Sequence, residues 1–253
     1  MCLILFSYQQ HPDYKLVIAA NRDEFYDRPT EEAGYWEDEP NILAGRDIEA
    51  GGTWMGMNHH GKIAMLTNFR DPYNIKTDAP SRGKLVSDFL KKDLKTEAYL
   101  QAIADEGMKY NGFNLICGNP DQLYYYGNYQ QGVHPVPAGI HGLSNALLDT
   151  QWPKVDKGKV KLETALNANR LDMEVLFDLL YDNQMAPENE LPDTGIGLDK
   201  EKVLSSIFIK SPRYGSRCST VIAVDKNNHV RFAERTYDLK DFTFTEKQFE
   251  FRF

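Results

Sequence analysis

The chain has 253 residues, of which 42% are hydrophobic and 26% are charged, and its formal net charge is -8. This composition is typical of a globular protein with a substantial core, and it excludes a largely disordered chain. The negative charge disfavours nucleic acid as a partner, because binding phosphates requires a basic face. We expect a single domain over residues 1–253.

The N-terminus, MCLILFSYQQ, lacks a basic region and contains only a short apolar run. It therefore indicates neither a signal peptide nor an integral membrane segment, and we expect a soluble, cytoplasmic protein. The widely spaced cysteines Cys2, Cys117 and Cys218 fit neither a disulfide framework nor a zinc site. The sequence carries no signal for an oligomeric state.

Strands are predicted where short apolar segments rich in Val, Ile, Phe and Tyr are bounded by turn residues. In chain order these segments are residues 2–7, 16–20, 53–57, 62–68, 114–117, 123–126, 207–210, 219–224 and 229–235. Residues 58–61, 118–121 and 226–228 have the composition of hairpin turns. Short turns of this kind predict antiparallel pairing.

Helices are expected in two blocks between the strands. Ser81 and Thr96 can each cap a helix, and the apolar spacing from Met173 to Leu180 is that of an amphipathic helix. The loop at residues 183–200 is the best candidate for a mobile segment. Grouped helices among hairpins predict an α+β fold rather than alternating β and α units.

Cys2 becomes the N-terminal residue when the initiator Met is removed, which a small second residue permits. It then carries a thiol and a free α-amine, so one residue supplies both a nucleophile and a base. The alternative interpretation is that Cys2 only begins a core strand as a small buried side chain.

Two other motifs do not support a function. Residues 56–62 spell GxxxxGK, but Ile63 stands where a phosphate-binding loop needs Ser or Thr, and a strand rather than a helix is expected to follow. The pair His59-His60 lies at a predicted turn without a third ligand at useful spacing, so a solvated loop is the simpler interpretation.

Polar residues stand at the ends of several predicted strands. They are Asn21-Arg22-Asp23-Glu24, Thr67-Asn68, Ser144-Asn145 and Arg217-Cys218-Ser219-Thr220. Each group alone could be an ordinary turn or cap. Together with Cys2 they supply a nucleophile, a base, cations and amide donors, which is the set of groups that acyl transfer requires.

The segment AANRDEFYDRP at residues 19–29 resembles the signature of the NRDE family, which includes the transport and Golgi organization 2 proteins. The resemblance continues through further motifs: GGTWMGMN (51–58), TNFR (67–70), YNGFNL (110–115), GLSNALLDTQWPK (142–154) and YGSRCST (214–220).

A more distant resemblance is to choloylglycine hydrolases and penicillin V acylases, which are N-terminal nucleophile hydrolases. It implies a four-layer αββα sandwich of two antiparallel sheets between helical layers. The matching positions are Cys2, Asn21, Asp23, Gly56-Met57-Asn58, Gly61, Asn68 and Asn145, with a looser match at Arg217. Those enzymes place an Arg three residues before the Asp, whereas here Arg22 directly precedes Asp23 and Ala20 occupies the aligned position.

This resemblance assigns a role to each candidate residue. Cys2 would attack an acyl carbonyl and Asp23 would orient its α-amine. Asn68 and Asn145 would donate to the oxyanion and the amine, while Arg217 and Arg22 would lower the thiol pKa. No metal or organic cofactor is expected.

Three functions remain open at this stage. The favoured one is a hydrolase or acyltransferase that acts on a small amide or thioester. The alternative on the same fold is a non-catalytic carrier of an acyl-CoA, a lipid or a haem-like ligand. A structural partner in membrane trafficking is the third.

Overall fold

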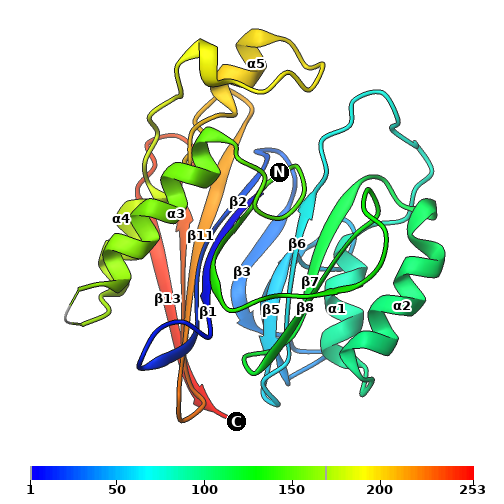
Figure 1. Cartoon of the computed structure of the whole chain (residues 1–253), viewed down its shortest axis with the longest axis vertical. Coiled ribbons are helices and arrows are strands. Elements are labelled where there is room, and N and C mark those ends of the chain that lie inside the picture. The colour runs from blue at the N-terminus through cyan, green and yellow to red at the C-terminus, as the bar shows by residue number, and fades with distance from the viewer. Residues whose placement is uncertain (1, 169) are drawn as a thin grey trace.

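The computed structural model describes residues 2–168 and 170–253. Two antiparallel sheets lie face to face, and helices cover their outer faces (Figure 1). The first sheet has the order β10-β1-β2-β11-β12-β13, and the second has the order β3-β4-β5-β6-β7-β8-β9. The expected α+β fold, a four-layer αββα sandwich, is confirmed.

The strands of the first sheet are β1 (Cys2–Tyr8), β2 (Tyr14–Phe25), β10 (Gly139–Leu143), β11 (Tyr214–Asp225), β12 (His229–Tyr237) and β13 (Phe244–Arg252). Those of the second are β3 (Thr30–Tyr35), β4 (Ile42–Asp47), β5 (Met55–Asn58), β6 (Ile63–Asn68), β7 (Phe113–Asn119), β8 (Gln122–Gly127) and β9 (His134–Pro135). The α-helices are α1 (Gly83–Lys91), α2 (Thr96–Glu106), α3 (Pro153–Leu166), α4 (Met173–Leu180) and α5 (Leu198–Val203), with 3-10 turns at Gly107–Lys109 and Glu188–Glu190.

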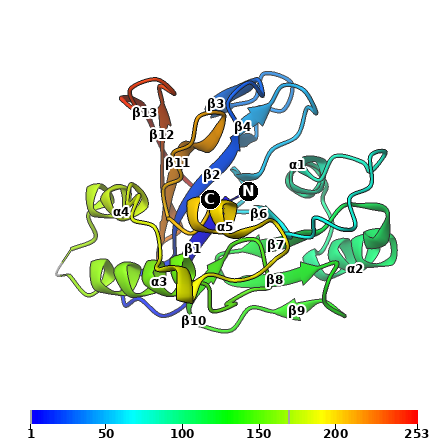
Figure 2. The ribbon, with the colours of Figure 1, turned by 90° about the horizontal axis from the view of Figure 1, so that it is seen from above.

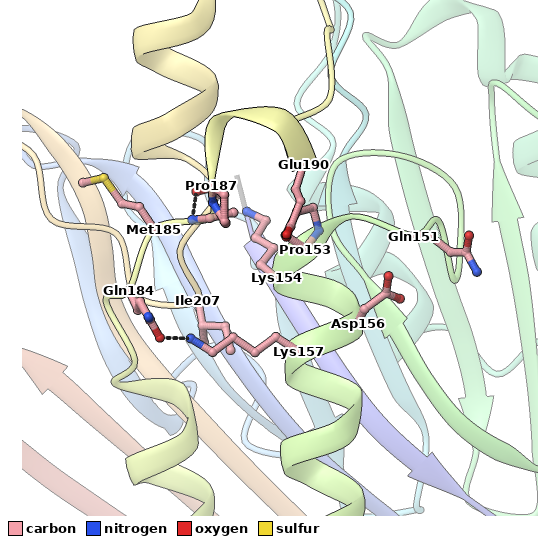
Figure 3. A pocket seen from close by; sticks show the side chains of 12 residues that line it. Gln151, Pro153, Lys154, Asp156, Lys157, Gln184, Met185, Pro187, Glu190 and Ile207 are labelled. Atoms are coloured by element: carbon pink, nitrogen blue, oxygen red, sulfur yellow. Dashed lines mark hydrogen bonds between the residues drawn. The ribbon is translucent and has the colours of Figure 1, made fainter.

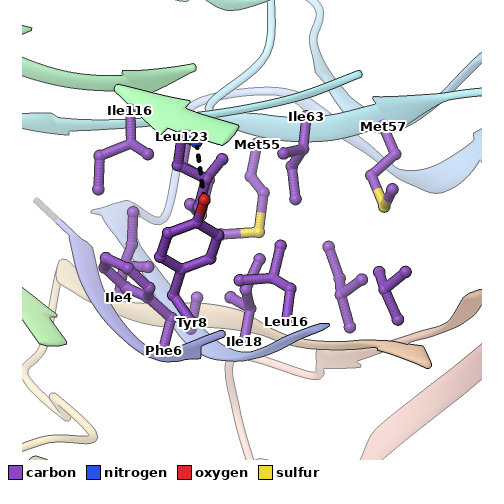
Figure 4. Close-up of a cluster of buried hydrophobic side chains, with 14 of the residues drawn as sticks. Ile4, Phe6, Tyr8, Leu16, Ile18, Met55, Met57, Ile63, Ile116 and Leu123 are labelled. Carbon is purple, nitrogen blue, oxygen red and sulfur yellow. Dashed lines mark hydrogen bonds between the residues drawn. The ribbon is translucent and has the colours of Figure 1, made fainter. Parts of the chain in front are cut away.

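Strict alternation along β1 and β2 assigns each side chain to one of two cores. Ile4 and Phe6 of β1 face the second sheet, where they meet residues such as Met65 and Ile116 (Figure 4). Leu3 and Leu5 point the other way, against α3 and α4. Because successive side chains of a strand point to opposite faces, β1 must be buried on both sides, as its continuous apolar sequence indicates.

The helices form the outer layers, and the two layers lie on opposite sides of the sandwich (Figure 2). Leu162 of α3 and Phe177 of α4 pack on the first sheet. Phe89 of α1 and Leu100 of α2 pack on the second sheet. Each layer therefore buries one apolar helix stripe against one sheet face.

The structure corrects the predicted elements in several places. The strand predicted at residues 207–210 is wrong, because these residues are buried but pair only through a bridge at Lys210. The second strand runs on to Phe25, so the polar residues from Asn21 lie within it rather than after it. Helix α3 was not predicted from the sequence, because most of its residues are polar or charged and its apolar stripe is narrow.

A close approach of two glycines fixes the loop that precedes α1. Thr53 donates a backbone hydrogen bond to the carbonyl of Gly83, with an N to O distance of 3.2 Å. A Cβ at Gly52 would lie 2.4 Å from the backbone carbon of Gly83, so only glycine fits at this position. The contact holds the start of α1 against the segment that leads into β5.

We expect Gly52→Ala to lower the free energy of unfolding by about 1–3 kcal/mol, because a backbone clash cannot be relieved by moving a side chain. Gly34→Ala is the control. No atom lies within 4 Å of the added Cβ at that position, and the change should stay below about 0.5 kcal/mol. Urea unfolding followed by circular dichroism checks both values, and equal effects of the two substitutions would contradict the packing argument.

Candidate functional site

Antiparallel pairing brings several strand ends together around Cys2, which begins β1. Cys2 lies opposite Arg22 of β2 in the register, and Arg22 in turn lies opposite Cys218 of β11. On the other side of β1, Ile4 pairs with Leu143 at the end of β10, so the chain that follows β10 runs toward Cys2. Residues far apart in sequence therefore meet at this end of the first sheet.

A β-bulge at Arg217 determines what faces Asp23. The register pairs Cys218 with Arg22 and Ser216 with Asp23, which leaves Arg217 as an extra residue. Ser216 consequently shares a face with Asp23, and its hydroxyl donates to the Asp23 carboxylate over 2.5 Å. Without the bulge, Arg217 would occupy the position opposite Asp23.

Asp23 is a buried carboxylate, with an exposed fraction of 1%. Burial raises its pKa, and the charge of Lys154 together with the Ser216 hydrogen bond opposes that rise. Its backbone carbonyl also accepts a hydrogen bond from the Tyr214 hydroxyl. Asp23 is thus held rigidly beside the start of β1.

The Cys2 side chain lines a cavity of about 340 Å³ together with Arg22, Asp23, Asn68 and Arg82. Burial raises the pKa of the Cys2 thiol, while a hydrogen bond from the backbone of Asp23 acts in the opposite direction. The thiol is therefore protonated at neutral pH and needs a base before it can act as a nucleophile. Cys2, Cys117 and Cys218 are all free thiols.

Arg22 faces the space between the sheets, on the face of β2 opposite to Asp23. Its guanidinium donates to the Thr30 hydroxyl at 3.0 Å and lies 3.8 Å from the Asp47 carboxylate. It also stacks over the Trp54 ring, with 4.2 Å between the guanidinium carbon and the ring centroid. Arg22 is thereby fixed in the wall of the Cys2 cavity.

Asn68 and Asn145 connect the two sheets beside Cys2. Asn145 is buried, and its side-chain amide donates to the backbone carbonyl of Asn68 over 2.9 Å. The neighbouring Ser144 hydroxyl donates to the carbonyl of Cys2. The two asparagines therefore lie next to each other near the start of β1, and their role as donors to an oxyanion or an amine stays a prediction.

Arg217 lies apart from this group. Its guanidinium donates to the carbonyls of Phe25 and Arg28, which ties β11 to the turn after β2. Among the described residues that line the Cys2 cavity, Arg217 does not occur.

Three residues near the site were not singled out in the sequence. Lys154 is buried in the first turn of α3, and Arg82 at the start of α1 lines the Cys2 cavity. Asp149 accepts hydrogen bonds from the Gly142 amide and the Lys159 ammonium, and contacts His141 at 2.7 Å. Asp149 and Lys154 both lie in the motif at residues 142–154. The presence of charged residues in this motif could have indicated them as candidates.

A larger apolar pocket of about 800 Å³ adjoins the Cys2 cavity. Glu24, Asn68, Arg82 and Asn111 line both spaces. The walls of the pocket include the side chains of Phe25, Phe69, Ile75, Ile196, Val203 and Leu204. An elongated apolar group could therefore lie in this pocket with a polar end toward Cys2.

His59 packs away from this region, stacked on Tyr35 with 4.8 Å between ring centroids and edge-on to Phe251. Over residues 2–168 and 170–253, no cluster of three or more His, Cys, Asp or Glu side chains could hold a metal ion. In the same residues, no helix is long and apolar enough to span a membrane.

The fold is that of the N-terminal nucleophile hydrolases. A *Caenorhabditis elegans* N-acylethanolamine-hydrolyzing acid amidase ortholog has a similar structure, with a TM-score of 0.50 at 10% identity, over 88% of this chain and 92% of that one. Residues 1–239 match the family described as Transport and Golgi organisation 2, and the chain belongs to this family.

Relatives within the family match almost the whole chain. The human Transport and Golgi organization protein 2 homolog is 39% identical over 99% of both chains. The Transport and Golgi organization protein 2 of *Drosophila melanogaster* is 28% identical over 93% of this chain and 92% of its own length.

Asp149 should stabilise the loop that carries Asn145 in a pH-dependent way. Its hydrogen bonds outweigh burial and lower its pKa to about 2. A carboxylate whose pKa is lower in the folded than in the unfolded state stabilises the fold. This stabilisation is complete above the unfolded pKa of about 4 and is lost as the pH falls toward 2. We expect Asp149→Asn to cost about 1–2 kcal/mol at pH 7, allowing for solvent screening.

Urea unfolding of the wild type and the variant at pH 7, 5, 4 and 3 tests this expectation. The difference in unfolding free energy should be constant from pH 7 to pH 5 and fall by about half by pH 3. A difference that stays unchanged down to pH 3 would show that the Asp149 charge does not stabilise the loop.

Proposed function

We propose that the protein is an N-terminal cysteine hydrolase or acyltransferase that acts in the cytoplasm on a small amide or thioester. The observation that carries this proposal is the position of Cys2 in a cavity wall, with the buried Asp23 carboxylate beside it and Asn68 and Asn145 next to it. A nucleophile, an orienting carboxylate and amide donors within one site are what acyl transfer requires.

In this mechanism the α-amine of Cys2, exposed when Met1 is removed, takes the thiol proton. The raised pKa of the thiol makes such a base necessary. The Cys2 sulfur attacks the acyl carbonyl, and the bond to the leaving amine or thiol breaks as the leaving group receives that proton. Water or an acceptor nucleophile then cleaves the acyl-Cys2 thioester and regenerates the thiol.

The asparagines and Asp23 supply the remaining functions. One N–H of the Asn145 amide is used by the Asn68 carbonyl, which leaves the second N–H and the Asn68 amide as donors to the oxyanion. Loss of one such donor costs about 3 kcal/mol in comparable sites. Asp23 would accept a hydrogen bond from the Cys2 amine and orient its lone pair toward the thiol.

The apolar pocket beside the cavity supports an apolar acyl group as the transferred group. Its entrance shares Asn68 and Arg82 with the Cys2 cavity, so an acyl chain in the pocket could present its carbonyl to Cys2. The same pocket favours the second candidate function, a carrier that binds an acyl-CoA, a lipid or a haem-like ligand without reaction.

Substitution of Cys2 distinguishes the two candidates. Against a panel of N-acyl amides and acyl thioesters, we expect Cys2→Ala to retain ligand binding and to lose acyl release by on the order of 10³-fold, because the covalent step is removed. Cys2→Ser should lose a similar amount, because the same weak base must activate a hydroxyl of much higher pKa. Intact-mass analysis of the wild type should reveal an acyl adduct on Cys2 and the absence of Met1.

Cys117→Ala is the matched control, because this thiol is fully buried in the core between the second sheet and α1 and α2. It should form the adduct at the wild-type rate. If the wild type and Cys2→Ala bind the same ligands and neither releases an acyl group, the carrier function replaces the enzyme.

A further inference from the structure

Lys154 is a buried cation at the start of α3, on the helix side of the first sheet. It stands at the second position of α3, has an exposed fraction of 2%, and extends from that helix toward the segment that carries Pro187 (Figure 3). Among the residues that the structure describes, none forms a hydrogen bond with its Nζ. A buried ammonium without such a bond needs a carboxylate close by.

The charged and titratable groups around Lys154 come from four elements. They are Cys2 of β1, Asp23 of β2, Arg70 after β6 and Glu201 of α5. Arg70 and Glu201 form their own ion pair at 2.6 Å, with both side chains less than a tenth exposed. Of the two carboxylates, Asp23 has the larger stabilising charge effect on the ammonium of Lys154.

The two arginines that the sequence placed at this site have partners other than Asp23. Arg22 is on the opposite face of β2 and is bound to Thr30 and Asp47. Arg217 is bound to backbone carbonyls of the turn after β2. Lys154 thus supplies positive charge to Asp23 from the helix layer.

We propose that Lys154 is a positioning residue of the Cys2 site, whose ammonium keeps the Asp23 carboxylate ionised so that Asp23 can orient the Cys2 amine. This inference rests on the proposed function, because it concerns the activation of the same thiol. Burial lowers the pKa of Lys154 to about 8, which leaves it mainly protonated at pH 7. Without it, burial drives Asp23 to take up a proton.

The test is the rate of Cys2 alkylation by iodoacetamide between pH 6 and pH 10, on purified protein whose N-terminal processing is verified by intact mass. We expect Lys154→Met to slow alkylation about tenfold at pH 7, the effect of about one unit of pKa. The difference in alkylation rate between Lys154→Met and the wild type should become smaller at high pH, because the thiol and the carboxylate are then ionised even without Lys154. Lys154→Arg should restore part of the rate because it keeps the charge.

Lys157→Met is the matched control. Lys157 lies one turn along α3 and pairs with Asp182 at 2.7 Å, with its side chain 35% exposed. It has the same residue type as Lys154 and lies on the same helix, but its partner Asp182 does not line the Cys2 cavity. Its substitution should leave the alkylation profile unchanged.

A double variant tests whether Lys154 acts through Asp23. If it does, Lys154→Met combined with Asp23→Asn should alkylate no more slowly than Asp23→Asn alone, because the carboxylate that Lys154 serves is gone. Additive losses, or a wild-type profile in Lys154→Met, would overturn the inference. Thermal unfolding of each variant establishes that the site is compared in folded protein.

The outcomes separate this inference from the proposed function. An acyl adduct on Cys2 combined with an unchanged profile in Lys154→Met would refute only the role of Lys154. Slower alkylation in Lys154→Met without any acyl adduct in the wild type would refute only the enzyme.

Discussion

The antiparallel register of β1 with β2 and β10 is the constraint on which the site depends. Strand β1 and the central part of β2 are buried on both faces, so a slip of one residue would turn each of their apolar side chains to the wrong core. The register also sets Cys2 opposite Arg22 and brings the end of β10 beside the start of β1. The packing that makes the sandwich stable therefore also assembles the polar strand ends.

Burial controls the chemistry at this end of the sheet. It raises the pKa of both Cys2 and Asp23 and lowers that of Lys154, so each group is pushed toward its neutral form. A charge persists there when an opposite charge lies nearby, and the Lys154 ammonium of the helix layer acts in this way on the Asp23 carboxylate of the sheet. The helix layer is thus part of the site rather than only a cover for the sheet.

The apolar pocket and the polar cavity are suited to bind different parts of one ligand. The pocket lies among Phe25, Phe69 and residues of α5, and the cavity lies between the start of α1 and the ends of β1 and β2. The buried ion pair between Arg70 and Glu201 holds α5 beside the apolar pocket. A ligand with an apolar chain for the pocket and a reactive polar end for the cavity fits this arrangement.

The sequence by itself determined the α+β class and most strands, because the alternation of apolar and polar residues is a local pattern. It also marked Cys2, Asp23, Asn68 and Asn145 as candidate site residues by their polarity at predicted strand ends, and their roles stay a prediction. The edge strands β3 and β13 and the polar helix α3 were not predicted, because the hydrophobic periodicity of half-exposed elements is weak.

Only the tertiary structure decided which cation serves the buried acid. A bulge at Arg217 changes the face on which the following residues lie, and no local pattern reveals it. The bulge places Ser216 opposite Asp23, and the Arg217 side chain binds the turn after β2 instead. Lys154 is far from Asp23 in sequence, and its charge acts on Asp23 only because α3 packs on the first sheet, which is a matter of how the layers pack.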